Sequence, residues 1–151
     1  MRKFWVLLLS CILMTISLTA CGSGEKKLVG AWTLESACYK YTNAELNIEH
    51  IKERLKHGVS TTDPEYMLYE KYDDICKIEF FSDGTCTVDG EHGTWKITDG
   101  KLMLLGSYGG DFRYASSIVG EFKVSNNKLE FFDAKIGRQS NASDLVYRKL
   151  D

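Results

Sequence analysis

The chain lacks a hydrophobic run long enough to cross a membrane, and it lacks a strong excess of charge of either sign. Its longest apolar stretch lies near the N-terminus, over residues 4–16, and is shorter than the ~18–20 residues that span a bilayer. The formal net charge is -2. No basic patch is present, which excludes a typical nucleic-acid-binding protein. No low-complexity segment interrupts the chain, so we expect one ordinary domain.

Sequence motifs of catalysis are also missing. The chain has no Gly-x-Ser-x-Gly elbow, no phosphate-binding glycine loop and no cysteine with a nearby histidine partner. His50, Glu53 and His57 share one face of an expected helix, but two histidines two turns apart lie ~10 Å from each other, too far to share one metal ion. The sequence therefore predicts a protein that is not an enzyme and that carries no metal and no cofactor.

The N-terminus has the organisation of an export signal. Arg2 and Lys3 precede the short apolar stretch, and small polar residues follow it. The stretch ends in Leu18-Thr19-Ala20-Cys21, which resembles the lipobox of bacterial lipoproteins. That resemblance implies cleavage before Cys21 and lipid on its thiol. The alternative is an ordinary cleaved secretion signal.

This resemblance divides the chain into a lipoprotein signal peptide over 1–20, a lipidated flexible tether over 21–27 and a folded domain over 28–151. The tether's residues have a reach of roughly 12–15 Å, so the domain would lie close to the bilayer. We therefore expect the protein to be anchored to a membrane, on its extracytoplasmic face, through the lipid on Cys21. Gly22 after the cysteine would allow sorting to the outer membrane if the cell is Gram-negative.

Three cysteines, Cys38, Cys76 and Cys86, remain in the domain, and an odd number cannot pair completely. Export permits disulfides, and Cys38 would face Cys76 if the strands on either side of the helical insertion were neighbours. The other interpretation is three small buried hydrophobic residues.

Hydrophobic periodicity predicts a mainly β fold. Residues 28–41 alternate as one long half-buried strand. Thr42 with Glu45 then matches a capping box for a helix that Gly58 would close. Asp63-Pro64 would start a second helix that ends at about Lys71.

From Asp73 onward the periodicity changes to two, and turn dipeptides, among them Asp89-Gly90 and Asp99-Gly100, separate short apolar strands. Alternation predicts several inward-facing pairs of side chains. These pairs are Ile78 with Phe80, Cys86 with Val88, Trp95 with Ile97, Leu102 with Leu104, Phe122 with Val124, and Leu129 with Phe131. About eight strands joined by tight turns avoid exposed edges by closing. We therefore expect an antiparallel up-and-down β-barrel with a two-helix insertion after strand one.

Gly30-Ala31-Trp32 at the start of the first strand resembles the Gly-x-Trp motif of the lipocalins, and the stretch from Phe80 to Thr85 resembles bacterial lipocalin-like lipoproteins. The resemblance implies a lipocalin-like barrel in which Trp32 packs across a closed end and Arg148 stacks on it. These are residues of the fold, not of a binding site. A second lipocalin motif is missing, and the helices follow strand one instead of preceding the last strand.

Tyrosines supply the candidate ligand-binding residues. Tyr66 and Tyr69 lie in the second helix, and Tyr108 and Tyr114 flank the Gly109-Gly110 turn. They would form an aromatic lid over a barrel mouth; the alternative is packing of the insertion on the barrel.

We therefore expect a non-enzymatic binding module for a small hydrophobic or amphipathic ligand. The second hypothesis is a protein-interaction lipoprotein, such as an inhibitor of an exported hydrolase or an envelope assembly factor.

Overall fold

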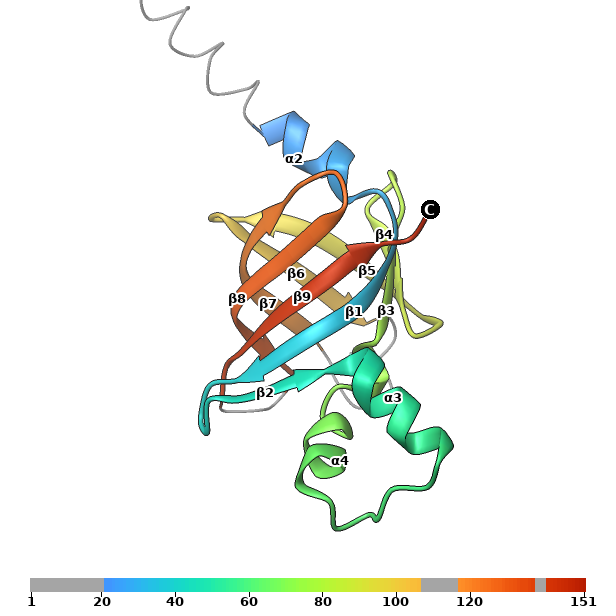
Figure 1. Ribbon diagram of the computed structural model, residues 1–151. Helices are drawn as coiled ribbons and strands as arrows, with labels where there is room; N and C mark the ends of the chain where they lie inside the picture. Colours follow the sequence, from blue (N-terminus) through green and yellow to red (C-terminus); the bar gives the residue numbers. More distant parts are fainter. Residues whose placement is uncertain (1–20, 107–116, 138–140) are drawn as a thin grey trace, which may run out of the picture.

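The computed structural model describes residues 21–106, 117–137 and 141–151, and it forms a closed antiparallel barrel (Figure 1). Each strand of the barrel pairs with the next along the chain, and the last pairs with the first. The eight strands are β1 (Gly30–Tyr39), β3 (Lys77–Phe80), β4 (Thr85–Val88), β5 (Glu91–Thr98), β6 (Lys101–Gly106), β7 (Ser117–Val124), β8 (Lys128–Ile136) and β9 (Ser143–Lys149). The predicted fold, an up-and-down barrel with helices inserted after strand one, is confirmed.

Two-residue turns set the register of the β4–β5 and β5–β6 hairpins. In the β4–β5 turn Asp89 and Gly90 have φ values of 46° and 89°, and in the β5–β6 turn Asp99 and Gly100 have φ values of 52° and 73°. Positive φ at both positions is the geometry of a type I′ turn, which matches the twist of the strands it joins. The predicted turn at Gly109-Gly110 lies outside the described residues.

The insertion begins with a strand, not with a helix. Residues Ala44–Asn47 form β2, which pairs with the second half of β1. The predicted capping box at Thr42 is therefore wrong. Helix α3 (Ile48–Lys56) starts at Asn47, whose side chain accepts a hydrogen bond from the His50 N–H at 2.9 Å. Residues 44–47 form a strand because β3 pairs only with Gly30–Thr33 of β1. The second half of the same edge of β1 is therefore free to pair with β2.

The second predicted helix is confirmed at its start. Asp63 caps α4 (Pro64–Tyr69) by accepting from the N–H groups of Glu65 and Tyr66, and Pro64 occupies the first turn. The helix ends at Tyr69, earlier than predicted, and a short 3-10 turn, η1 (Asp73–Ile75), leads into β3. Together β2, α3, α4 and η1 lie at one end of the barrel, which we name the insertion end (Figure 1).

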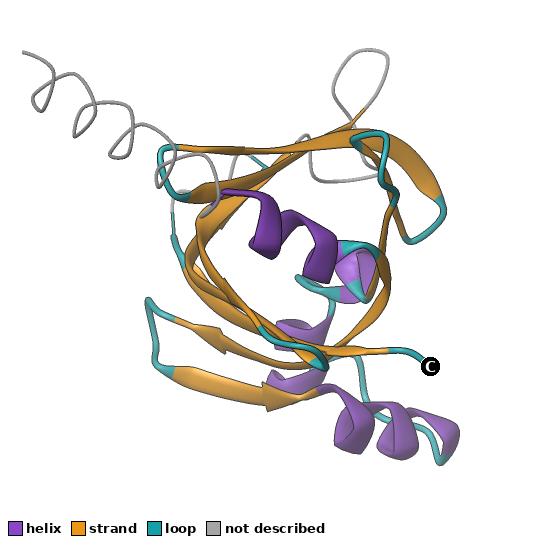
Figure 2. Ribbon diagram, turned by 90° about the horizontal axis from the view of Figure 1, so that it is seen from above, coloured by secondary structure: helices purple, strands orange, loops and turns teal. Residues whose placement is uncertain are grey.

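The opposite end, which we name the α2 end, carries a helix where a flexible tether is predicted. Helix α2 spans Cys21–Leu28 and lies across the barrel end when the barrel is viewed from above (Figure 2). Leu28 is fully buried, and its carbonyl accepts a hydrogen bond from Trp32 Nε1 at 2.7 Å. Leu28, the first residue of the predicted folded domain, therefore packs on the barrel, and α2 continues from it through residues 21–27.

Trp32 is fully buried at the α2 end, but the cation that lies over its ring is not the predicted Arg148. Lys149 Nζ lies 5.3 Å from the centroid of the Trp32 ring, and Trp32 pairs with Lys149 across β1 and β9. Cross-strand partners share a face of the sheet. Arg148 pairs with Thr33 and is exposed on the outer face, so the predicted stacking of Arg148 is wrong.

The three domain cysteines are free thiols. The Leu34 N–H donates to the Cys76 carbonyl at 2.7 Å, which places Cys76 beside Leu34. Cys38 lies four residues further along β1, ~13 Å at the rise of a strand, whereas a disulfide needs Cα atoms within about 7 Å. Of the two alternatives that the sequence left open, the Cys38–Cys76 disulfide is therefore absent, and Cys76 and Cys86 are small residues buried in the core.

Candidate functional site

The two described tyrosines of the predicted lid differ in exposure. Tyr69 is only 7% exposed, and its hydroxyl donates to Asp73. Burial, followed by that hydrogen bond, raises the pKa of Tyr69 far above its usual value. Tyr66 is half-buried beside Glu70, whose negative charge raises the pKa of Tyr66. Tyr108 and Tyr114 lie outside the described residues.

Two tyrosines that the sequence analysis did not select fill the insertion end of the barrel. Tyr72 and Tyr147 are fully buried. The Tyr72 hydroxyl is 2.9 Å from Ser143 Oγ, and the Tyr147 hydroxyl donates to the Ile75 carbonyl at 2.9 Å. Burial raises the pKa of both phenols, which keeps them neutral. Alternation of Leu145 with Tyr147 in the last strand was the available sequence indication that Tyr147 faces inward.

The α2 end has a different lining, made of apolar side chains that face inward but are only partly covered. They pack against the core from β5 and β7 and are only half-buried; we name them the apolar rim, which consists of Trp95, Ile97, Phe122 and Val124. The sequence analysis predicted all four as inward-facing. It did not predict their exposure, because that depends on where the strands end around the barrel.

Trp95 is held in one orientation within this rim. Its ring packs edge-on against Phe80, with centroids 5.6 Å apart and planes at 85°. Its Nε1 donates to the Phe81 carbonyl at 3.0 Å, and its backbone N–H donates to the Gly84 carbonyl at 2.8 Å. A fixed aromatic ring beside partly covered aliphatic groups can bind an apolar molecule at a small cost in side-chain entropy.

At the insertion end, ion pairs hold α3 against α4. Arg54 Nη2 lies 2.6 Å from Asp63 Oδ2, and Arg54 Nη1 pairs with Glu65. His50 Nδ1 is 3.3 Å from Glu65 Oε1. The Arg54 guanidinium holds the pKa of Asp63 below its usual value. Among the residues that the structure describes, no three His, Cys, Asp or Glu side chains are grouped closely enough to bind a metal ion.

A groove of about 310 Å³ separates α3 from the outer face of β1. Arg148 lines it together with charged side chains of α3, including Glu49, Lys52 and Glu53. This groove lies outside the barrel, and charged side chains of both signs surround its apolar residues Leu34 and Ile48. The apolar rim is therefore the better candidate for a hydrophobic ligand.

Comparisons with known proteins leave the family open. No protein-family model matches the chain, and no curated protein matches it. Among solved structures, the chain is similar to a DUF4847 family protein from Bacteroides vulgatus ATCC 8482. The two are 15% identical with a TM-score of 0.44, over 86% of this chain and 100% of that one. Within the described part of the chain, no helix combines the length and apolar character that crossing a membrane requires.

Proposed function

We propose that this protein is a non-enzymatic, membrane-anchored lipoprotein of the extracytoplasmic face that binds a small hydrophobic or amphipathic ligand. The observation that carries the proposal is the apolar rim at the α2 end of a closed barrel. Barrels of eight strands either are filled by side chains or hold one small ligand. The half-buried rim supports binding at the α2 end.

The proposed anchor lies at this same end. Cys21 is the first residue of α2, and α2 contacts β7, the strand that carries Phe122 and Val124 of the rim. A diacylated Cys21 would hold the rim within a short distance of the bilayer, where amphipathic ligands are concentrated. Each buried acyl methylene contributes ~0.8 kcal/mol to membrane affinity, so two chains anchor firmly.

The anchor is tested by comparing two substitutions of cysteine in the precursor. Cys21→Ala should abolish acylation and release the domain from membranes or leave uncleaved precursor. Cys11→Ala, the matched control within residues 1–20, should be acylated as the wild type. The intact mass of the protein recovered from the membrane fraction measures acylation in both variants. Unchanged acylation of Cys21→Ala would refute the lipobox.

Ligand binding is tested with a pair of substitutions on opposite faces of β7. Val124 belongs to the apolar rim, whereas Val119 faces outward on the same strand. Val124→Asp should weaken binding of a fluorescent fatty-acid probe about tenfold or more, because the ligand would desolvate a carboxylate. Val119→Asp should leave binding unchanged. Equal effects of the two variants, or no binding by the wild type, would contradict the proposal.

Native mass spectrometry of the protein purified without detergent adds a direct test. A stoichiometric small adduct that Val124→Asp loses would identify the ligand by mass.

A second candidate function is protein interaction through the insertion end. Its supporting observation is that Tyr41 and Met67, at this end, are 76% and 55% exposed. Exposed large apolar side chains mark a contact surface where they form one patch. A photo-crosslinker at Met67 should then capture a defined envelope protein in cells, whereas one at Phe132 on the barrel wall should not.

A further inference from the structure

The charge of the domain is unevenly distributed along the barrel axis. Without residues 1–20, the chain has 17 Lys and Arg against 21 Asp and Glu. The insertion segment, residues 42–76, holds four of these basic residues and eight of the acidic ones. The insertion therefore accounts for the whole net charge of -4, and the remainder of the domain is balanced.

The α2 end carries exposed cations and exposed apolar side chains close together. Lys26 and Lys27 are exposed in the last turn of α2, and Lys149 Nζ is 3.3 Å from the Lys27 carbonyl. Phe81 and Leu150 are 38% and 43% exposed. Phe81 directly follows β3 and Leu150 directly follows β9, and the last residues of these two strands pair with the start of β1. This combination of lysine and apolar side chains is typical of surfaces that contact a bilayer interface.

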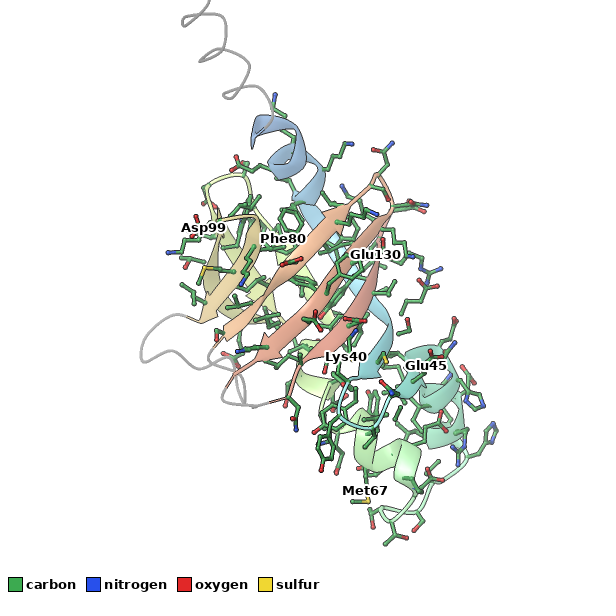
Figure 3. The ribbon with its side chains drawn as sticks, turned by 90° about the vertical axis from the view of Figure 1, so that its left-hand side faces the viewer. Lys40, Glu45, Met67, Phe80, Asp99 and Glu130 are labelled. Carbon is green, nitrogen blue, oxygen red and sulfur yellow. The ribbon has the colours of Figure 1, made fainter. Side chains whose placement is uncertain are left out.

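The two ends point in opposite directions. Figure 1 shows α2 at one end of the barrel and α3 and α4 at the other. In Figure 3, Asp99 marks the α2 end and Met67 marks the far side of the insertion. A negatively charged membrane surface attracts the lysines of the first end and repels the net negative charge of the insertion. Both effects fall off within about 10 Å, so only the end nearest the bilayer feels them strongly.

We infer that the α2 end is a membrane-docking surface for anionic lipid headgroups, through Lys26, Lys27 and Lys149, and that the insertion points away from the bilayer. The inference rests on the proposed anchor at Cys21, which brings this end to the membrane. It adds a fixed orientation: the protein stands on its α2 end instead of turning freely on its lipid. The apolar rim then faces the bilayer.

Lysine footprinting of the lipidated protein tests this orientation without added labels. The protein is placed on vesicles of phosphatidylcholine alone or of phosphatidylcholine with phosphatidylglycerol, and acetylation of each lysine is followed by mass spectrometry. On anionic vesicles, acetylation of Lys26 and Lys27 should slow about threefold or more relative to the protein in detergent, while Lys52 and Lys56 in α3 should be unaffected. Neutral vesicles should give weaker protection.

Two charge-reversed variants provide the matched comparison. Lys26→Glu with Lys27→Glu should abolish the protection of Lys149 on anionic vesicles. Lys52→Glu with Lys56→Glu, which changes the net charge equally at the other end, should preserve it. The docking surface would be overturned if the lysines of both ends were acetylated at equal rates on anionic vesicles. It would also be overturned if neutral vesicles protected Lys26 and Lys27 as strongly as anionic vesicles do.

Failure of the anchor is distinguishable from failure of the docking surface. If the protein is not acylated in cells, its mass shows this directly, and in a Cys38→Ser variant, which lacks the other accessible thiol, the Cys21 thiol can instead be coupled to a maleimide phospholipid in the vesicles. The footprint on those vesicles then reports the orientation independently of lipidation in the cell.

Discussion

Cys76 and Cys86 are buried in the core, whereas Cys38 is half-buried on the outer face of β1. Burial raises the pKa of Cys76 to about 11 and that of Cys86 to about 12. Because the thiolate is the reactive form, both buried thiols should be inert in the folded protein. Cys38 is left as the accessible thiol of the domain.

N-ethylmaleimide should therefore add once to the native polypeptide of residues 22–151, and the peptide carrying the adduct should contain Cys38. Unfolding in urea without reductant should allow three additions, because all three thiols are free. Intact mass and peptide mapping measure both results. Two missing additions after unfolding would reveal a disulfide and contradict the structure.

The Tyr147 hydroxyl gives a second prediction for a single residue. It donates to the Ile75 carbonyl inside the barrel, so Tyr147→Phe leaves a buried carbonyl without its donor. We expect the free energy of unfolding to fall by about 1–3 kcal/mol. Tyr41→Phe, at a side chain that is 76% exposed, should change it by less than about 0.5 kcal/mol. Urea denaturation followed by tryptophan fluorescence measures both, and equal effects would contradict this role of Tyr147.

At the level of elements, the start of α3 depends on Asn47. Asn47→Ala removes the side-chain acceptor for the His50 N–H and should destabilise the protein by about 1 kcal/mol. Asn47→Asp keeps an acceptor and should remain close to the wild type. Urea denaturation of both variants checks the difference. If Thr42→Ala were the more damaging substitution, the helix would start where the capping box predicts.

Local sequence patterns predicted some elements well and others poorly. The Asp89-Gly90 and Asp99-Gly100 hairpins were predictable because a type I′ turn is specified by its own two residues. Ala44–Asn47 was not, because its conformation depends on where β3 leaves the edge of β1. The conformation of this segment is set by its pairing with β1 in the tertiary structure, which outweighs the local capping motif.

The candidate site shows the same division. Alternation predicted which side of β5 and β7 faces inward, but the exposure of the rim depends on strand lengths around the barrel. Alternation from Tyr147 to Lys149 also placed Lys149, not Arg148, on the face of Trp32. The alternation in the sequence therefore favoured Lys149, whereas the lipocalin resemblance favoured Arg148.

At the scale of the whole molecule, the insertion and the barrel share one core. Tyr69, Tyr72 and Ile75 of the insertion belong to the same buried cluster as Trp32 at the opposite end. Tyr72 reaches Ser143, which is 71 residues away in the sequence and fully buried. The insertion should therefore unfold together with the barrel, because separating them exposes paired polar groups and apolar surface at once.

A double-mutant cycle between Tyr72→Phe and Ser143→Ala tests this shared core. Each single substitution should lower the free energy of unfolding by about 1 kcal/mol, and the double variant should lose about 1 kcal/mol less than the sum, because the bond is lost only once. Urea denaturation followed by fluorescence of Trp32 and Trp95, both in the barrel, measures the cycle. Ser143→Ala with Tyr147→Phe should be additive, since their hydroxyls have different partners and the residues lie ~13 Å apart along β9. Additivity of the first pair would mean that the insertion merely lies against the barrel.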